Sequence, residues 1–155
     1  DIVQRMARCF TERNAAAVIA FEKVPLEDVH RYGIAKPKTE GETFEIEDLI
    51  EKPSRQEAPS NLAIAARYIF APAIFGAIRR TAPGKGGEIQ ITDAIRLLLS
   101  EGGRVFGICL RDGEERYDIG NFQSYFRTFV EFALEDEKLG ATLRRHLETL
   151  LAHHP

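Results

Sequence analysis

The sequence predicts an α/β fold, because short apolar runs typical of strands alternate with segments of helical periodicity. Apolar side chains recur at helical spacing over residues 2–13, and the apolar run AAAVIAF over 15–21 follows directly. A helix followed by a buried strand is typical of a parallel α/β sheet. The end of the chain changes pattern and predicts two consecutive C-terminal helices.

Five further segments are expected before residue 81: a short helical turn, two strands that pair as a hairpin, a longer strand, and a helix. Their ranges are 25–33, 33–35 with 44–50, 61–70, and 72–80. The hairpin crosses the polar loop KPKTEGET and adds antiparallel strands, so the predicted sheet is mixed. Pro72 suits the first turn of its helix, where its missing N–H is not needed.

The second half continues with a helix over 93–100, for which Thr92 is the expected N-cap. Gly102 and Gly103 end that helix, and residues 104–110 form the next predicted strand. The loop PGKGGE at 83–88 lacks the spacing of a phosphate-binding loop and does not follow a strand, so we reject that interpretation. The two final helices are expected over about 122–138 and 141–151, with Gly140 as the break between them.

Composition narrows the class of protein. The chain has 155 residues, of which 44% are apolar and 29% charged, and we expect a single domain over 1–155 with a helical tail over 121–152. A net charge of −3 argues against nucleic-acid binding. No apolar run reaches the roughly 20 residues that a bilayer requires, so the cytoplasm is the expected compartment. Cys9 and Cys109 are far apart in apolar segments and predict two buried free thiols, with a disulfide or a metal-binding pair as the alternative.

The adjacent pair Glu51-Lys52 is the strongest candidate for chemistry. It lies at the end of an apolar strand, which Pro53 must terminate because proline removes a backbone donor. A charged pair at a strand end beside a loop is well placed to bind a polar, anionic ligand. The alternative is a solvated ion pair that contributes less than about 1 kcal/mol.

Several motifs together resemble the bacterial UTP–glucose-1-phosphate uridylyltransferases. They are Tyr32-Gly33, LIEKPSRQEAPSNLAIAARY over 49–68, GEIQITDAI over 87–95 and YDIGN over 117–121. The resemblance covers only the second half of that family, and it implies the second half of a Rossmann-like nucleotidyltransferase domain. The family's Gly-rich nucleotide-binding segment, GxGTRxLPxTKxxPKEM, has no counterpart here. Because the sequence opens with Asp1 inside the first predicted helix, we expect a fragment or a processed product.

The resemblance implies roles for the strand-end residues. Lys52 would contact the phosphate of the sugar substrate, Glu51 would accept hydrogen bonds from sugar hydroxyls, and Gly33 would present its backbone N–H to the sugar. Tyr68 would lie near the sugar, although a packed core tyrosine is an equal alternative. For Gly33 the alternative is a turn glycine with positive φ.

Asp118, by the same resemblance, is one of two aspartates that bind a catalytic Mg²⁺, a cation that prefers hard oxygen ligands. The alternative is a helix-initiation residue, with Asn121 as N-cap. Asn61 is assigned a structural role. Ala66 departs from the family, which usually has a glycine two residues before the tyrosine at position 68.

The implied reaction converts UTP and glucose 1-phosphate into UDP-glucose and diphosphate, with glucose 1-phosphate and UTP as partners and a homo-oligomer as the assembly. Two alternatives remain: a sibling enzyme that uses another nucleoside triphosphate, and a non-catalytic sugar-phosphate-binding or assembly module. The aromatic stripe of the first C-terminal helix has spacing i, i+3, i+4, i+7 and is expected in the core, or else at an oligomer contact. Its members are Phe122, Tyr125, Phe126 and Phe129.

Overall fold

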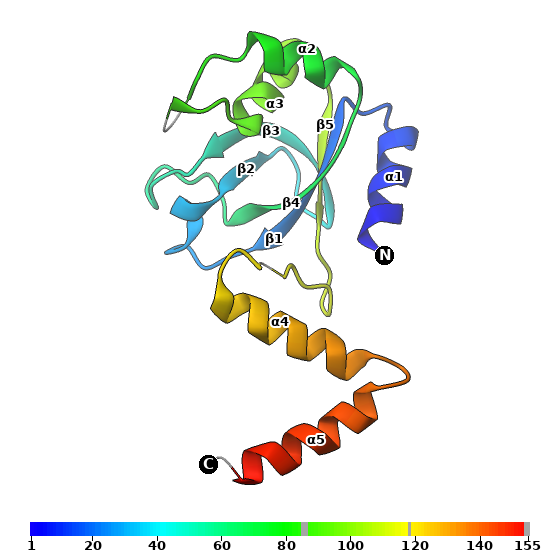
Figure 1. Cartoon of the computed structure of the whole chain (residues 1–155). Helices are drawn as coiled ribbons and strands as arrows, with labels where there is room; N and C mark the ends of the chain where they lie inside the picture. The colour runs from blue at the N-terminus through cyan, green and yellow to red at the C-terminus, as the bar shows by residue number, and fades with distance from the viewer. Residues whose placement is uncertain (85–86, 118, 154–155) are drawn as a thin grey trace. The chain divides into compact units, whose positions relative to one another are not determined.

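The computed structural model describes residues 1–84, 87–117 and 119–153 (Figure 1). The chain forms two compact units, Asp1–Glu114 and Glu115–Pro155, which are described separately. The first unit contains the sheet and three of the helices, and the second contains the two C-terminal helices. The tail expected over 121–152 lies in this second unit.

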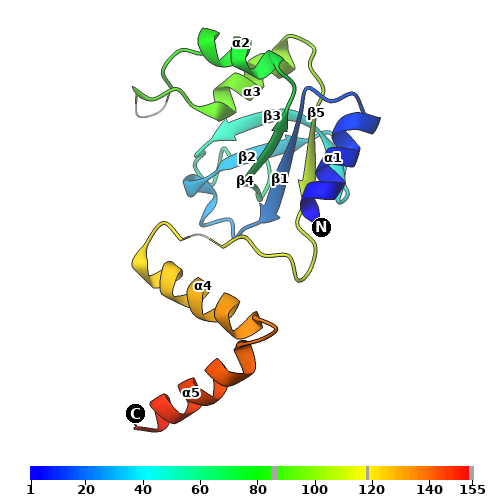
Figure 2. The same cartoon turned by 45° about the vertical axis from the view of Figure 1, so that its right-hand side comes forward.

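Five strands form the sheet of the first unit. They are β1 (Ala17–Lys23), β2 (Gly33–Pro37), β3 (Thr43–Glu51), β4 (Leu62–Phe70) and β5 (Val105–Cys109). Their order is β1-β4-β2-β3-β5, and β5 also pairs with β1, so the sheet closes into a barrel. The strands curve around one another accordingly (Figure 2).

The sheet is mixed, as predicted. Among the described strands only β1 and β5 run parallel, whereas the pairs β1–β4, β2–β3, β2–β4 and β3–β5 are antiparallel. The hairpin predicted from 33–35 and 44–50 is confirmed as β2 and β3. The helix-then-strand pattern at the start of the chain therefore predicted parallel pairing correctly for one neighbour of β1 and not for the other.

The helices of the first unit also match the predicted ranges. They are α1 (Ile2–Glu12), the 3₁₀ turn η1 (Val29–Arg31), α2 (Ala73–Arg80) and α3 (Ile91–Ser100). Pro72 precedes α2 with helical backbone angles, in agreement with its expected place at the helix start. In both cartoon views α2 and α3 lie together on one side of the sheet and α1 lies on another (Figure 2).

Three apolar clusters lie in the described part of the first unit, and β1 belongs to the two larger ones. Ile19 and Phe21 face the cluster that includes α2 and α3, whereas Val18 and Ala20 face the cluster that includes α1. Successive strand residues point to opposite faces, so a strand covered on both sides must be apolar throughout. This explains why AAAVIAF has no polar alternation.

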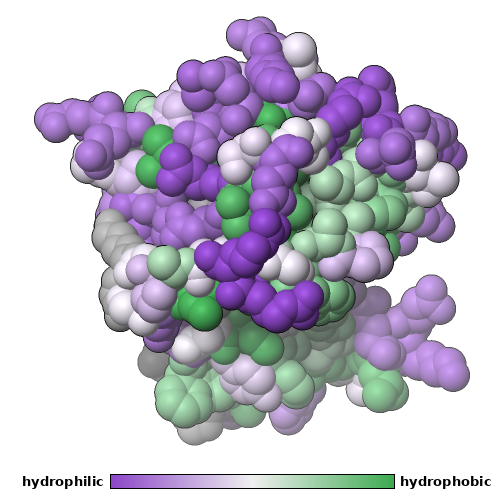
Figure 3. Space-filling model, turned by 90° about the horizontal axis from the view of Figure 1, so that it is seen from above, coloured by the Kyte–Doolittle hydropathy of each residue, from purple (hydrophilic) through white to green (hydrophobic). Residues whose placement is uncertain are grey.

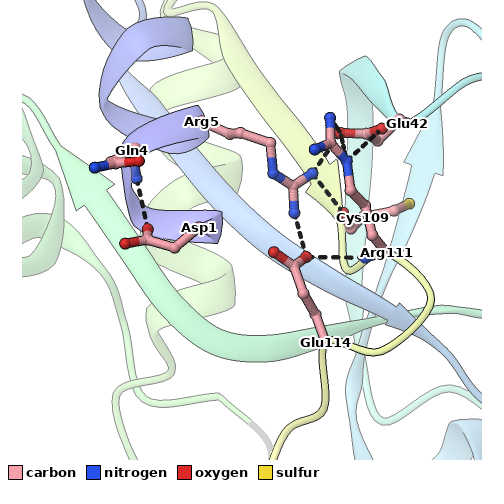
Figure 4. A network of polar contacts seen from close by, with 7 residues as sticks. All are labelled: Asp1, Gln4, Arg5, Glu42, Cys109, Arg111 and Glu114. Carbon is pink, nitrogen blue, oxygen red and sulfur yellow. Dashed lines mark hydrogen bonds and ion pairs between the residues drawn. The ribbon is translucent and has the colours of Figure 1, made fainter.

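A largely buried arginine, Arg5, connects α1 with two distant segments (Figure 4). The Arg5 guanidinium is paired with Glu42, in the turn between β2 and β3, and with Glu114. Its Nη1 also donates to the Cys109 carbonyl at 3.2 Å, and its side chain is only 16% exposed. Arg111 adds a 3.0 Å ion pair to Glu42 from a more exposed position.

One predicted helix cap is wrong. Gln90 is the N-cap of α3, and the helix begins at Ile91, so Thr92 lies inside the first turn rather than before it. Thr92 is only 2% exposed, because its side chain faces the interior of the first unit. Its hydroxyl has a partner there, described below.

The second unit consists of α4 (Phe122–Glu135) and α5 (Gly140–His153). Asn121 caps α4, as the alternative interpretation of YDIGN had it, since its side chain accepts a 3.0 Å hydrogen bond from the Ser124 N–H. The helix ends at Glu135 instead of about Lys138, and Gly140 is the first residue of α5 rather than the break. Asp136 causes the earlier end, because its carboxylate accepts from the Lys138 and Leu139 N–H groups, at 2.9 and 2.8 Å.

The aromatic stripe of α4 is not in the core, so that prediction is wrong. Its members, Phe122, Tyr125, Phe126 and Phe129, are between 45% and 81% exposed. Their rings contact mainly each other along the helix, for example Phe122 and Phe126 at 6.2 Å between centroids. A 3.6-residue period shows that one face is apolar and cannot show what covers it.

Seen from the side on which α2 and α3 lie, the surface is largely hydrophilic, with apolar areas between the charged side chains (Figure 3). No helix among the described residues is long and apolar enough to cross a bilayer. Both cysteines are free: Cys9 is buried as expected, whereas Cys109 is only partly buried. Burial raises the pKa of both thiols.

Candidate functional site

The predicted site residues Gly33, Glu51 and Lys52 come together where β2 begins and β3 ends. Gly33 is the first residue of β2 and pairs directly with Glu51, the last residue of β3. The Lys52 N–H donates to the Tyr32 carbonyl at 2.9 Å and so extends this pairing by one residue. Pro53 follows and the strand stops, as the sequence indicated.

Glu51 is mostly buried and its two carboxylate oxygens face different partners. Oε2 accepts a 2.7 Å hydrogen bond from the Thr92 hydroxyl. Oε1 lies 3.7 Å from the Lys52 Nζ, and the Glu51 side chain is only 15% exposed. One oxygen is thus fixed from within the protein, while the other lies beside a lysine that is 47% exposed.

Lys52 has a left-handed backbone, with φ of 46°. In a regular strand its side chain would point to the face opposite Glu51. The left-handed turn at Lys52 ends the alternation and lets its ammonium approach the Glu51 carboxylate. This conformation costs a residue other than glycine about 1–2 kcal/mol, and such strain is concentrated at functional sites.

Gly33 is required by close packing, not by a turn. Its φ is not positive, so the turn-glycine interpretation is wrong. A Cβ at this position would lie 2.8 Å from Ile64 Cδ1 and 3.1 Å from both Glu51 Oε2 and Thr92 Oγ1. A larger residue would therefore push Ile64 aside and crowd both partners in the hydrogen bond between Thr92 and Glu51.

Tyr68 lies in β4, partly buried, and its ring stacks on Phe70 at 5.3 Å between centroids. Burial, and to a smaller extent the negative charge of Glu51, raise the pKa of Tyr68 to about 12. The Glu51 charge thus acts on Tyr68 from the end of β3. Both interpretations of this tyrosine stay open, since it packs against the core and is also influenced by the strand-end carboxylate.

Ala66, two residues before Tyr68, has a φ of 52°. Left-handed backbone is the usual reason for a glycine. The conformation therefore explains why glycine is common at this position in the family that the sequence resembles. The sequence alone identified the departure at Ala66 and gave no reason for it.

Asn61 has the structural role that the sequence favoured. Its side-chain amide donates to the Val24 carbonyl at 3.2 Å, and its own carbonyl accepts from the Val24 N–H at 3.1 Å. The predicted metal ligand, Asp118, lies outside the described residues. Within the described ranges no group of three or more His, Cys, Asp or Glu side chains could bind a metal ion.

Thr92 is the site residue that the sequence analysis did not assign to the site. It is the one buried polar residue among those the structure describes, and its partner lies 41 positions away in the sequence. A signal was present: a threonine stands among the apolar residues of ITDAI, in the first turn of a helix that buries Ala94 and Ile95. That signal was interpreted as a cap.

A groove of about 810 Å³ lies elsewhere, between β3 and the helices α2 and α3. Its lining includes Arg80, Arg96 and Arg104, each of which is paired with an acidic side chain. None of Gly33, Glu51, Lys52 and Tyr68 lines it. The strand-end site is therefore separate from this groove.

Comparisons with known proteins agree with the resemblance seen in the sequence. The chain is 42% identical over 141 residues to a UTP–glucose-1-phosphate uridylyltransferase of Bacillus subtilis, covering 90% of this chain and 47% of that protein. It is 44% identical over 125 residues to a putative UTP–glucose-1-phosphate uridylyltransferase of Methanocaldococcus jannaschii, covering 80% and 43%. The chain thus spans about half the length of these relatives.

Solved structures give the same answer. A UDP-glucose pyrophosphorylase complexed with UDP-glucose superposes with a TM-score of 0.72 at 36% identity, over 81% of this chain and 46% of that one. A UTP-bound enzyme of the same kind from Acinetobacter baumannii gives 0.80 at 28% identity, over 94% and 49%. The predicted resemblance and fold class are confirmed. The sequence model of the nucleotidyl transferase family matches residues 1–135, and the chain belongs to that family.

Proposed function

We propose that this chain is the sugar-phosphate-binding half of a UTP–glucose-1-phosphate uridylyltransferase. The observation that supports this most directly is the Glu51–Lys52 pair, with Glu51 fixed by Thr92 and Lys52 turned beside it by a left-handed backbone. Relatives that are 42% and 44% identical bear the name of this activity. Glucose 1-phosphate is the proposed ligand of the strand-end site.

The two side chains suit different parts of that ligand. A lysine ammonium is a compact point charge that binds phosphate oxygens well. A carboxylate accepts hydrogen bonds only, so Glu51 is suited to the hydroxyl groups of the sugar. In this proposal Lys52 neutralises the phosphate, Glu51 selects the sugar, Gly33 presents its N–H to it, and Tyr68 lies near the ring.

In the proposed reaction a phosphate oxygen of glucose 1-phosphate attacks the α-phosphate of UTP, and diphosphate leaves. The protein contributes positioning and neutralisation of charge, without a covalent intermediate. Mg²⁺ would supply additional positive charge at the phosphates. A carboxylate such as that of Asp118 is a hard oxygen ligand of the kind Mg²⁺ prefers, and Asp118→Asn should shift the Mg²⁺ dependence of turnover.

The test is steady-state kinetics of the full-length protein with Lys52→Ala and Glu51→Gln. Lys52→Ala should raise the KM for glucose 1-phosphate about tenfold to a hundredfold, since a charge-assisted contact is worth about 1.5–3 kcal/mol. Glu51→Gln should instead reduce discrimination between glucose 1-phosphate and its epimers, because the amide replaces an acceptor oxygen by a donor.

Lys38→Ala is the matched control for the lysine. Lys38 also forms a partly exposed ion pair, with Glu45 at 2.8 Å, but it lies in the turn region between β2 and β3. The substitution Lys38→Ala should therefore leave the KM for every sugar phosphate unchanged. Wild-type kinetics of both site variants toward all sugar phosphates would mean that Glu51 and Lys52 are only a solvated strand end.

We also propose a homo-oligomer that uses the exposed aromatic face of α4. Phe122, Phe126 and Phe129 are each at least 61% exposed, and contiguous apolar surface of this kind marks interaction sites. Sedimentation of the wild type against Phe126→Ser measures the assembly, with Arg127→Ser on another face of the helix as control. A monomeric wild type would refute this assignment.

A further inference from the structure

We propose that Thr92 is a positioning residue that sets the orientation of the Glu51 carboxylate toward the sugar. This inference rests on the proposed function, because it concerns the residue that would select the sugar. Thr92 itself is 2% exposed and would not touch the ligand. It acts through its 2.7 Å hydrogen bond to Glu51 Oε2.

The hydrogen bond leaves the carboxylate few alternatives. A buried hydroxyl without a partner is costly, so the Thr92 hydroxyl remains directed at Oε2. Rotation of the carboxylate away from Thr92 would leave that hydroxyl unpaired. The second oxygen, Oε1, is then the one available beside Lys52 Nζ, at 3.7 Å.

The packing around this bond is equally restrictive. The position of a Cβ on Gly33 would be 3.1 Å from both Thr92 Oγ1 and Glu51 Oε2. Three elements therefore meet at the bond: the start of β2, the end of β3 and the first turn of α3. The missing side chain of Gly33 leaves the space in which Thr92 can reach Glu51. This role is separate from any contact that the Gly33 N–H makes with the sugar.

Helix α3 gives Thr92 a fixed base. Ala94, Ile95 and Leu98 of the same helix are each no more than 4% exposed and pack in the core cluster of the first unit. Thr92 is thereby placed by the hydrophobic core rather than by a loop. Sites supported by packed helices and strands hold their geometry better than sites built on loops.

The experiment compares Thr92→Val with Thr92→Ser in the full-length protein, with epimeric sugar 1-phosphates as substrates. Valine keeps the shape and removes the hydroxyl, whereas serine keeps the hydroxyl. Thr92→Val should lower kcat/KM for glucose 1-phosphate about tenfold and reduce discrimination between epimers, as expected for a lost hydrogen bond to a charged group. Thr92→Ser should retain most of the kcat/KM for glucose 1-phosphate and most of the discrimination between epimers.

A double-mutant cycle identifies the route of the effect. If Thr92 acts through Glu51, then Thr92→Val should cost little more in a Glu51→Gln background, so the two losses should not add. Additive losses would overturn the proposal, as would wild-type selectivity in a Thr92→Val protein whose melting temperature shows it to be folded. If Thr92→Val does not fold, an equal loss of selectivity in folded Thr92→Ser would overturn it.

The same variants separate this inference from the proposed function. Normal kinetics in Glu51→Gln and Lys52→Ala would refute the sugar-phosphate site itself. Altered sugar selectivity in Glu51→Gln, together with wild-type selectivity in Thr92→Val, would support the site and refute only the role of Thr92.

Discussion

At the scale of single residues, backbone conformation is as informative as side-chain chemistry. Among the residues that the structure describes, three other than glycine have positive φ: Asn14, Lys52 and Ala66. Asparagine tolerates this conformation, and Lys52 lies in the proposed site. Ala66 has neither explanation, so it marks a position where the chain bears a cost.

Replacing Ala66 by glycine should stabilise the protein. Glycine removes the left-handed strain of about 1–2 kcal/mol and loses part of that gain to a more flexible unfolded chain. The expected net increase in the free energy of unfolding is therefore about 0.5–1 kcal/mol. Urea denaturation of the wild type and Ala66→Gly measures it.

Ala63→Gly is the matched control, in the same strand. Ala63 is fully buried and has ordinary strand geometry, so glycine there should destabilise the fold by about 0.5–1 kcal/mol or more. The two Ala→Gly substitutions should thus have opposite signs. Destabilisation by both would show that the conformation of Ala66 costs nothing.

Tyr68 should make stability depend on alkaline pH. Its folded pKa is raised to about 12 by burial and by Glu51, whereas an unfolded tyrosine titrates near 10. Between these values the unfolded chain releases the proton first, so the stability gained from neutral Tyr68 is present below about pH 10 and is lost as the pH rises toward 12. Urea denaturation at pH 9 and pH 11 should show a smaller decline for Tyr68→Phe than for the wild type. An equal decline would place the Tyr68 pKa at its ordinary value.

At the scale of elements, the Arg5 cluster joins three segments that are far apart in the sequence. Arg5 comes from α1, Glu42 from the turn between β2 and β3, and Glu114 follows β5 (Figure 4). These segments are separated by 37 and 109 positions from Arg5. Removing a cation that is so little exposed should destabilise the fold, because the negative charges of its partner carboxylates would no longer be compensated.

Arg5→Ala should lower the free energy of unfolding by about 2 kcal/mol, since removal of one partner of a buried pair costs about 3–5 kcal/mol and these acids are partly exposed. Arg111→Ala is the control, because Arg111 is 57% exposed and also pairs with Glu42. It should cost no more than about 1 kcal/mol. Urea denaturation distinguishes them, and equal losses would show that the burial of Arg5 is irrelevant.

At the scale of the whole molecule, the most important feature is that the chain covers only about half the length of its relatives. The Bacillus subtilis relative is covered to 47% of its length. The Gly-rich segment that binds nucleotide in that family has no match in these 155 residues. In our proposal the strand-end site binds only the sugar phosphate.

The isolated chain should therefore not form UDP-glucose. Diphosphate release from UTP and glucose 1-phosphate, measured with Mg²⁺ present, should stay at the background rate. The full-length Bacillus subtilis relative serves as positive control, and a cooperative urea transition verifies that the isolated chain is folded. Steady turnover at a rate comparable to that control would mean that the active site has been placed wrongly.

The sequence by itself determined the elements of this protein and the family to which it belongs. Apolar periods of two and 3.6 residues are local, so they located the strands, the hairpin of β2 and β3, and helices α1 to α3 to within a few residues. The pair Glu51-Lys52 and the run GEIQITDAI could be identified as motifs in the sequence. Asn121 was identified as a cap for the same reason, since its hydrogen bond spans three positions.

Only the tertiary structure decided what depends on contacts between distant residues. The bond from Thr92 to Glu51 crosses 41 positions, and closure of the sheet needs β5 beside β1, so neither leaves a local pattern. The left-handed backbone of Lys52 is likewise invisible in its residue type. Periodicity showed that α4 has an apolar face, but exposure is set by what packs against it. Local chemistry fixes which residues are available, and long-range packing fixes which of them meet.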